Sequence, residues 1–352
     1  LIINKSKKVF LITEPKKAKI LIKNKIINKN QLININDLQK KILLINGKNF
    51  IIDNKSCSVF YENIIKSKFD ITSREDPTYL LKAIKNKTEI KNMINSHILD
   101  GVALTKFIYW IKNINKKNIT EVDAQIKLEQ FRKKNRNYLY PSFDTIAGSG
   151  ANGAIVHYRA KKENCKFIKK NDIFLCDSGG QYKYGTTDVT RTLCFSEPKQ
   201  NIKNIYTKVL KGHIAVATTN LLKDNIGKKI DKRARKYLNK SNLDYAHGTG
   251  HGVGFFLNVH EGPQSISKLN NIKIKEGMIL SNEPGYYKKG KFGIRIENLV
   301  YVNKVKNKIF FENLTLAPLE KELINFNLLT KLEKNYLFKY HLYVYSKISK
   351  FL

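Results

Sequence analysis

Three glycine-rich stretches constrain the fold of this chain more than any other feature, because each carries acidic or imidazole side chains beside flexible backbone. They stand out from a background rich in Lys, Asn and Ile. The stretches are Phe174–Thr192, His247–Pro263 and Ser281–Asn298. A single Asp near a turn is usually a turn former. Five acidic or imidazole residues in such unusual surroundings instead predict a chemical site.

The first stretch predicts a hairpin with a carboxylate on each strand. Asp177 ends an apolar strand, Gly179 and Gly180 favour a turn, and Asp188 begins the returning strand. Two such carboxylates can converge on a cation. Burying both without a cation is strongly unfavourable, because of desolvation and mutual repulsion.

The other two stretches add imidazole and further carboxylates. His247, His251 and His260 are interleaved with glycines, which let the backbone approach a site closely. Glu283 is expected to end one strand and Glu297 to lie within the next. Together these residues predict a metal site with mixed oxygen and nitrogen ligands.

Three other histidines, His97, His213 and His341, fall in helical patterns without such neighbours, and we expect them to be structural. The glycine-rich run His247–Gly254 is not a phosphate-binding loop, because it lacks the Gly-Lys-Ser/Thr ending.

Length and composition indicate a globular chain. The 352 residues allow about two or three domains, and 42% are hydrophobic. No apolar run is long enough for a transmembrane helix. The four cysteines are scattered, which argues against a disulfide framework and favours a reducing compartment. Because the chain begins with Leu1 in mid-pattern, we expect an N-terminal portion, with any targeting signal, to be missing.

The net charge of +36 is the feature most suggestive of nucleic acid. Only eight of the 65 basic residues are Arg, however, and Lys is spread along the whole chain. Arg is the residue suited to bidentate recognition of phosphates and bases. We therefore attribute the charge to a general enrichment in Lys and expect no nucleic-acid partner.

Periodicity predicts an α/β segment followed by a larger region of helices and strands. A boundary is expected at Ser73–Pro77, and Thr120 and Asp123 resemble a helix capping box. A helix–strand–strand pattern then occurs twice. The expected strands are 8–13, 18–22, 49–53, 276–283 and 293–303, and the expected helices are 58–66, 85–113, 199–218, 228–239 and one from 329 onward.

The motifs resemble those of the pita-bread metallopeptidases, and their amino-acid sequences are most similar to those of cytosolic-type aminopeptidase P enzymes. The tail Phe310–Leu319 resembles the C-terminal extension of the same enzymes. The stretches that carry the resemblance are Ser142–Tyr158, Asp177–Tyr182 with Thr187–Thr192, His247–His251 with Val259–Pro263, and Glu283–Tyr287 with Gly293–Glu297.

The resemblance implies an α+β, pita-bread fold in three parts. Residues 1–77 would be a truncated α/β N-terminal domain of the creatinase type. Residues 78–308 would be the catalytic domain, and 309–352 the C-terminal extension.

The resemblance also implies the roles of the site residues. Asp177, Asp188, His251, Glu283 and Glu297 would bind two divalent ions, with Asp188 and Glu297 bridging them. The hard donor set suits Mn²⁺, while Zn²⁺, Co²⁺ and Fe²⁺ remain alternatives.

Catalytic and substrate-binding roles are implied for the remaining residues. His157, His247 and His260 would line the substrate site, and Glu283 would also transfer a proton. Tyr287 and Arg295 would hold substrate and carboxylates in position.

The function implied is that of a cytoplasmic aminopeptidase that cleaves the bond between an N-terminal residue and a penultimate proline. A metal-bridging hydroxide would be the nucleophile. Its partners would be peptides with proline in second position and a second copy of the chain, and neither nucleic acid nor a membrane is expected.

Two alternatives remain. The chain could be an X-Pro dipeptidase (prolidase) or another aminopeptidase of the same fold. It could also be a non-catalytic basic scaffold that binds nucleic acid.

Overall fold

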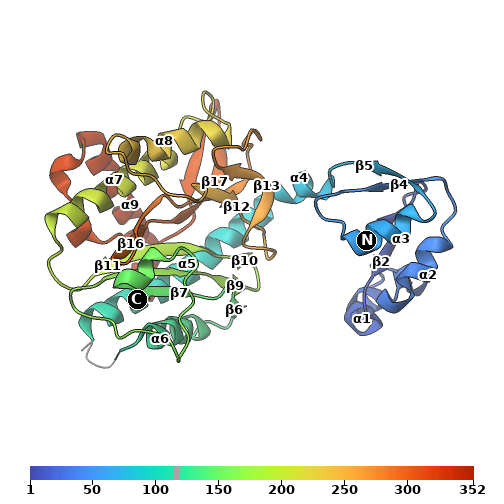
Figure 1. The fold of residues 1–352 in the computed structure, drawn as a ribbon, viewed down its shortest axis with the longest axis horizontal. Helices are drawn as coiled ribbons and strands as arrows, with labels where there is room; N and C mark the ends of the chain where they lie inside the picture. The colour runs from blue at the N-terminus through green and yellow to red at the C-terminus, as the bar shows by residue number, and fades with distance from the viewer. Residues whose placement is uncertain (115–118) are drawn as a thin grey trace. The chain divides into compact units, whose positions relative to one another are not determined.

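The structure, a computed structural model, describes residues 1–114 and 119–352 (Figure 1). These residues form two compact units, Leu1–Thr78 and Tyr79–Leu352. Residues 309–352 belong to the second unit. The assignment of the first part to a truncated creatinase-type domain stays a prediction.

The first unit is a small α/β unit. Its core contains Ile33, Ile42, Ile52, Ile65 and Phe69. Its strands are β1 (Ile2–Ile3), β2 (Val9–Ile12), β3 (Leu32–Ile33), β4 (Asn49–Ile52) and β5 (Asp70–Ser73), and its helices are α1 (Pro15–Lys23), α2 (Leu38–Leu43) and α3 (Val59–Lys66). Two short 3₁₀ turns, η1 (Lys29–Gln31) and η2 (Ile35–Asp37), connect them. Strands β2 and β3 pair in parallel, as do β4 and β5.

The strand predicted at Ala18–Ile22 is wrong, because these residues lie in helix α1. Pro15 stands at the first helical position, where its missing N–H has no partner to lose. Ala18 is buried while Ile20 is exposed. An apolar run this short does not distinguish a strand from a helix.

The second unit contains the remaining helices and strands. Its helices are α4 (Thr78–Ala83, shared with the boundary), α5 (Lys87–Asn113), α6 (Glu121–Lys133), α7 (Gln200–Ala217), α8 (Gly227–Asn239) and α9 (Lys331–Ile348). Its strands are β6 (Tyr138–Pro141), β7 (Ile146–Ser149), β8 (Ile173–Ser178), β9 (Gly180–Tyr182), β10 (Gly185–Thr186), β11 (Val189–Cys194), β12 (Gly250–Gly252), β13 (Glu261–Ile266), β14 (Ile279–Asn282), β15 (Gly285–Lys288), β16 (Phe292–Arg295), β17 (Asn298–Val305) and β18 (Lys308–Asn313). Short 3₁₀ turns are η4 (Gly150–Ala154), η5 (Lys321–Leu323), η6 (Phe326–Leu328) and η7 (Ser349–Phe351).

One half of this unit packs helices α5 and α6 against the antiparallel sheet β11-β8-β7 (Figure 1). Phe107 and Ile111 of α5 and Leu128 of α6 meet Phe174 and Val189 of the sheet in one buried cluster. Helix α6 begins at the predicted capping box, in which Thr120 and Asp123 bond each other's backbone.

The other half packs α7 and α8 against the sheet β13-β12-β14-β17-β18. Val216 of α7 and Ile230 and Ala234 of α8 contact Leu280 and Val300 of the sheet. Each half therefore contains helices packed on a sheet. On the second sheet, Ile279 and Leu299 point to the face opposite Leu280 and Val300 and pack with Met93 of α5. Asp177 of β8 and His251 of β12 are the site residues that these two sheets carry.

Arg191 on β11 joins the C-terminal segment to the strands of the site. Its buried guanidinium donates to the carbonyls of Glu297 at 2.6 Å, Ala317 at 2.9 Å and Pro318 at 2.8 Å. It also donates to the hydroxyl of Tyr340 on α9 at 3.0 Å. Helix α9 is thus hydrogen-bonded to the same residue that holds Glu297.

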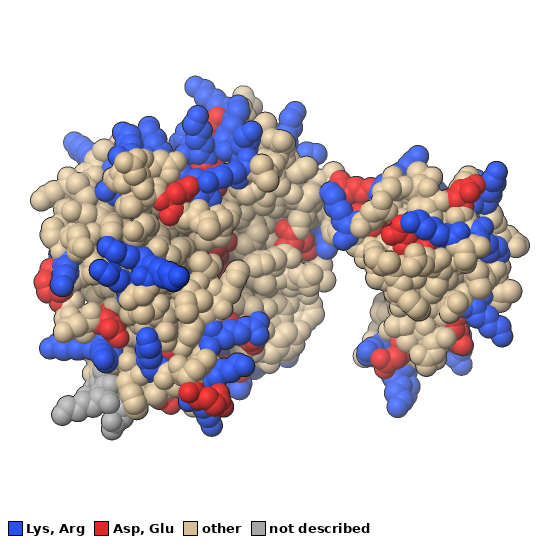
Figure 2. All heavy atoms as spheres, viewed as in Figure 1, with Lys and Arg blue, Asp and Glu red and all other residues tan. Residues whose placement is uncertain are grey.

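Basic side chains are distributed over the surface. On the face shown in Figure 2, Lys and Arg occur in several separate groups and not in one continuous patch. None of the helices in the described ranges is long and apolar enough to cross a membrane.

His213 has the buried, hydrogen-bonded position expected of a structural histidine. His213 on α7 donates from Nδ1 to the carbonyl of Asn282 at 3.0 Å, and it is 1% exposed. Burial lowers the pKa of His213 to about 3. The native state therefore keeps this ring neutral where the unfolded chain protonates it.

Acid should therefore destabilise the second unit partly through His213. Below pH 6.5 the His213 ring is protonated in the unfolded state but stays neutral in the native state. The unfolding free energy therefore falls as pH falls, by about 1.4 kcal/mol per pH unit until about pH 3. His213→Gln should reduce this slope. Urea unfolding from pH 7 to pH 4.5, with chelator present and Trp110 fluorescence as the probe, measures it. Parallel lines for the variant and the wild type would contradict the assignment.

Candidate metal centre

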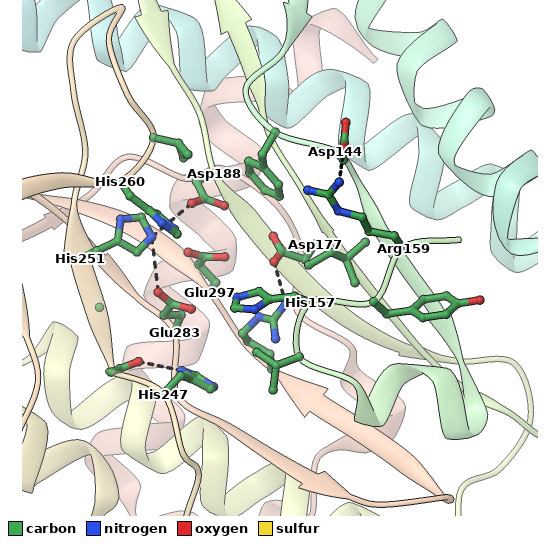
Figure 3. Close-up of a pocket in the computed structure, with 18 residues that line it drawn as sticks. Asp144, His157, Arg159, Asp177, Asp188, His247, His251, His260, Glu283 and Glu297 are labelled. Atoms are coloured by element: carbon green, nitrogen blue, oxygen red, sulfur yellow. Dashed lines mark hydrogen bonds and ion pairs between the residues drawn. The ribbon is translucent and has the colours of Figure 1, made fainter. Parts of the chain in front are cut away.

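The five predicted ligands, from distant parts of the chain, meet together with His260 in one cavity of the second unit (Figure 3). Their ligand atoms form overlapping groups of three, and within each group all atoms lie within 4.8 Å of one another. The groups are Asp177, Asp188 and Glu297; His251, Glu283 and Glu297; and Asp188, His251 and His260. Asp188, His251 and Glu297 each belong to two groups.

Short strands place the acidic residues at the cavity. Asp177 is on β8, opposite Thr190 of β11, and Asp188 directly precedes β11. The turn predicted at Gly179 and Gly180 is wrong: β9 and β10 form an additional small hairpin between the two carboxylates.

Glu297 does not lie within a strand, contrary to expectation. The single strand predicted at 293–303 is two strands, β16 and β17, and Glu297 lies between them. Its amide donates to the carbonyl of Thr190. The hydroxyl of Thr190 donates to Glu297 Oε2 at 2.8 Å. This break in the strand lets Glu297 reach the hairpin that bears Asp177 and Asp188.

His251 on β12 is oriented as a ligand should be. Its Nδ1 is 2.9 Å from the carbonyl of Gly252, so this nitrogen carries the proton. Its Nε2 then faces the carboxylates, at 3.4 Å from Asp188 Oδ2 and 3.4 Å from Glu283 Oε1. Ser281 donates to Glu283 Oε1 at 3.0 Å and accepts from the amide of His251 at 2.9 Å. Such supporting hydrogen bonds fix ligand orientation.

Arg295 is the cation that faces the cluster. It donates to Asp177 Oδ2 at 2.6 Å, to the hydroxyl of Tyr287 at 2.6 Å and to Thr190 Oγ1 at 3.0 Å. The Tyr287 hydroxyl is in turn 2.8 Å from Nε2 of His247. A chain of hydrogen bonds therefore connects His247 to Asp177.

The electrostatics of the site show an excess of buried negative charge. Burial, followed by repulsion from neighbouring carboxylates, holds the pKa of Asp188 and that of Glu297 well above their usual ranges. Burial also raises the pKa of Asp177 despite Arg295. At Glu283, burial alone would also raise the pKa. The charges of His251, His247 and Arg295 outweigh burial, and the pKa of Glu283 is lowered overall.

The three other predicted histidines line the same cavity, whose volume is about 440 Å³. The ring centroids of His260 and His251 are 4.0 Å apart, and Figure 3 shows His157 beside Asp177. Burial lowers the pKa of His247 and of His260, so both are neutral at pH 7. His260 is also close enough to Asp188 and His251 to be a ligand, a role that the sequence did not suggest.

Several residues at the site were not singled out from the sequence. Asp144 and Arg159 line the cavity and form an exposed ion pair at 3.3 Å. Thr190 and Ser281 donate hydrogen bonds to Glu297 and Glu283. Thr190 could have been found, because it lies two residues from Asp188 in a returning strand. Asp144 lies inside the stretch Ser142–Tyr158, which carries the family resemblance, and Arg159 directly follows it, but nothing in that stretch marks either residue individually.

The residues fit a pair of divalent cations. Carboxylate oxygens and an imidazole nitrogen are the donors that Mn²⁺ and similar ions accept. Asp177 Oδ1 is buried without a hydrogen-bond partner among the described residues. Cations would supply that partner and neutralise the repulsion between Asp188 and Glu297.

Comparison with known proteins agrees with this geometry. A family model described as metallopeptidase family M24 matches residues 91–304, and the C-terminal region of that peptidase family matches residues 308–352. A protein of Laccaria bicolor named Probable Xaa-Pro aminopeptidase P is 44% identical over 328 residues, which cover 90% of this chain and 51% of that protein. The chain thus spans about half the length of the curated relatives it matches.

Two solved structures show the fold. The X-prolyl aminopeptidase of Caenorhabditis elegans, described as a cytosolic enzyme with a di-nuclear active site, has a TM-score of 0.84 and 30% identity, over 96% of this chain and 57% of that one. The prolidase of Pyrococcus furiosus has a TM-score of 0.73 and 26% identity, over 87% of this chain and 86% of that one.

The fold and the acidic site define a metallopeptidase of the pita-bread class, and the predicted α+β fold is confirmed. Both the match over residues 91–304 and the match over the C-terminal region are to one family. The chain belongs to metallopeptidase family M24.

Asp188→Asn should have opposite effects with and without metal. In metal-free protein at pH 8 it removes one of the repelling carboxylates, so the melting temperature should rise by a few degrees. In the wild type, Mn²⁺ at 100 times its dissociation constant should stabilise by about 2.7 kcal/mol, and the variant should lose most of this gain.

Asp144→Asn is the matched control, since Asp144 lines the same cavity but is exposed and belongs to none of the ligand groups. It should melt like the wild type in both conditions. Equal metal-induced shifts in Asp188→Asn and the wild type would refute the ligand assignment.

Proposed function

We propose that this chain is a two-metal aminopeptidase that releases an N-terminal residue preceding proline. The observation that carries the proposal is the set of overlapping ligand groups, in which Asp188 and Glu297 are shared, inside a peptide-sized cavity. The names of the Laccaria and Caenorhabditis proteins support the specificity for proline. Asp177, His251 and Glu283 complete the proposed ligands.

Two divalent ions, for which we favour Mn²⁺, would lower the pKa of bound water and polarise the scissile carbonyl by withdrawing electron density from it. The remaining steps belong to the residues of the chain. Glu283 is placed to hold the proton of the attacking water on Oε2, since Ser281 donates to Oε1. It then passes that proton to the leaving nitrogen of proline.

His260 and His157 act on the substrate from opposite sides of the cavity (Figure 3). A neutral His260 donates an N–H to the carbonyl oxygen as negative charge develops on it. His157 is exposed to the cavity and offers a ring face to the proline.

His247, Tyr287 and Arg295 form the wall beside Asp177. Both ring nitrogens of His247 are hydrogen-bonded within the protein, to Gly248 and Tyr287. His247 therefore contacts the substrate through the face of its ring and holds the Tyr287 hydroxyl in position. Arg295 fixes the Asp177 carboxylate and thereby the position of the substrate amine.

The primary test is hydrolysis of an X-Pro-Pro tripeptide by Mn²⁺-loaded protein. We expect release of the first residue, complete inhibition by chelator and recovery with added metal. Asp188→Asn should lower kcat by a factor on the order of 10³ or more, because transition-state charge loses its main stabilisation. Metal binding without cleavage of any X-Pro tripeptide would refute the proposed reaction.

A dipeptidase is the second candidate, supported by similarity to the Pyrococcus prolidase. An X-Pro dipeptide in the same assay separates the two functions. The aminopeptidase predicts cleavage of the tripeptide at a much higher kcat/KM than the dipeptide. The reverse order would assign the chain as a dipeptidase.

The remaining expectations concern context. We propose a cytoplasmic enzyme, supported by the description of the Caenorhabditis protein as cytosolic. All five proposed ligands are present, which favours an enzyme over a basic nucleic-acid scaffold. The homodimer stays a prediction.

A further inference from the structure

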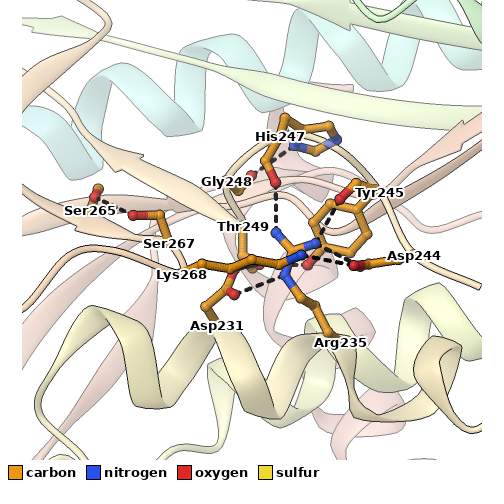
Figure 4. Close-up of polar contacts among 10 residues, drawn as sticks. All are labelled: Asp231, Arg235, Asp244, Tyr245, His247, Gly248, Thr249, Ser265, Ser267 and Lys268. Atoms are coloured by element: carbon orange, nitrogen blue, oxygen red, sulfur yellow. Dashed lines mark hydrogen bonds and ion pairs between the residues drawn. The ribbon is translucent and has the colours of Figure 1, made fainter.

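A single loop, residues 244–249, carries His247 into the cavity, and a buried ion pair on helix α8 lies beneath it (Figure 4). The pair is Asp231 and Arg235, one helical turn apart, with Arg235 Nε 2.8 Å from Asp231 Oδ2. Their side chains are 3% and 4% exposed. A buried ion pair by itself contributes little net stability. The role of this pair is therefore inferred from its contacts with the loop.

Arg235 directs its other nitrogens at the loop. Nη1 donates to Asp244 Oδ1 at 2.6 Å and to the carbonyl of Tyr245 at 2.7 Å. Nη2 donates to the carbonyl of His247 at 2.6 Å. The guanidinium also stacks on the ring of Tyr245, with Cζ 3.9 Å from its centroid. Two hydrogen bonds therefore hold the backbone carbonyls on both sides of residue 246, and two further contacts hold the side chains of Asp244 and Tyr245.

Asp231 holds the other end of the same loop. Thr249 Oγ1 donates to Asp231 Oδ1 at 2.6 Å, and the hydroxyl of Tyr245 also bonds Thr249. The carbonyl of Thr249 accepts from the amide of Glu283 at 2.8 Å. Asp231 and Arg235 thus connect a helix outside the cavity to the backbone of two residues that line it.

The ring of His247 depends on this backbone for its position. Its Nδ1 bonds the neighbouring carbonyl of Gly248, so the ring and the loop move together. Its Nε2 contacts the Tyr287 hydroxyl, which accepts from Arg295. A displacement of the loop would therefore move a wall of the substrate cavity.

We propose that Asp231 and Arg235 are positioning residues, which set the location of the His247 imidazole in the substrate cavity. The role in turnover rests on the proposed function, but the positioning itself does not. Arg233 provides a matched control on the same helix. It pairs with Asp224 at 3.5 Å and makes none of the contacts to the 244–249 loop shown in Figure 4.

The experiment is a double-mutant cycle on the metal-loaded full chain. Arg235→Gln should lower kcat/KM for the X-Pro-Pro tripeptide by roughly 10- to 100-fold, the range expected when a positioning contact is lost. Arg233→Gln should change it less than about twofold, as surface substitutions usually do. In a His247→Gln background, Arg235→Gln should have little additional effect, because it acts through a ring that is no longer present.

A purely structural role predicts a different result. Arg235→Gln would then reduce activity by the same factor in both backgrounds, and that outcome would overturn the proposal. Asp244→Asn is a milder variant for the case in which Arg235→Gln does not fold. It keeps Arg235 and weakens the contact between Arg235 and residue 244. Asp244→Asn should also lower kcat/KM in the wild-type background and have little additional effect in the His247→Gln background.

A second measurement separates this inference from the proposed reaction. The imidazole ¹⁵N resonances of His247, assigned by their absence in His247→Gln, should shift in Arg235→Gln and not in Arg233→Gln. This readout needs no substrate. A wild-type chain that cleaves no X-Pro peptide would refute the proposed function alone, whereas unchanged His247 resonances would refute the positioning role.

Discussion

The mutual repulsion of buried carboxylates is the interaction on which the rest of this structure depends. Asp177, Asp188 and Glu297 place oxygens within 4.8 Å of one another at 9%, 4% and 1% exposure. Only Arg295 faces them as a fixed cation among the side chains that line this cavity in the described chain. An arrangement of this kind opposes folding unless cations enter it. Metal affinity and the integrity of the inner faces of the two sheets are therefore parts of one equilibrium.

Much of the surrounding structure serves to hold these groups at fixed distances. Thr190 donates to the Glu297 carboxylate and Ser281 to that of Glu283, and Arg191 donates to the backbone carbonyl of Glu297. The hydrogen bond from Arg191 to Tyr340 also makes helix α9 part of this support. The C-terminal region that matches its own family model is thus packed against the strands of the site. On the other side, Asp231 and Arg235 give helix α8 the corresponding role at the His247 loop.

Sequence reasoning worked where local rules decide the structure. The capping box at Thr120, the long helix α5 and the tail helix α9 follow from spacing and capping alone. It failed where short apolar runs are ambiguous, as at Ala18–Ile22, which is helical. It also failed where a strand is interrupted, since nothing local to Glu297 indicates that β16 ends before it. The candidate residues could be picked from their glycine-rich surroundings, but Arg235 could not, because a basic residue in a Lys-rich amphipathic helix has no distinguishing pattern.

By itself, the sequence determined the chemical types in the site and the family to which the chain belongs. Carboxylates, imidazoles and glycines in a set order limit the chemistry to a hard metal centre. Only the tertiary structure decided which of them lie within 4.8 Å of one another, which nitrogen of His251 faces the carboxylates and which helix contacts the His247 loop. Several of these facts depend on contacts between residues far apart in the sequence, such as the contact of Arg295 with Asp177 across 118 positions. Such contacts are set by how the helices and sheets of the second unit pack together, and no local pattern in the chain encodes them.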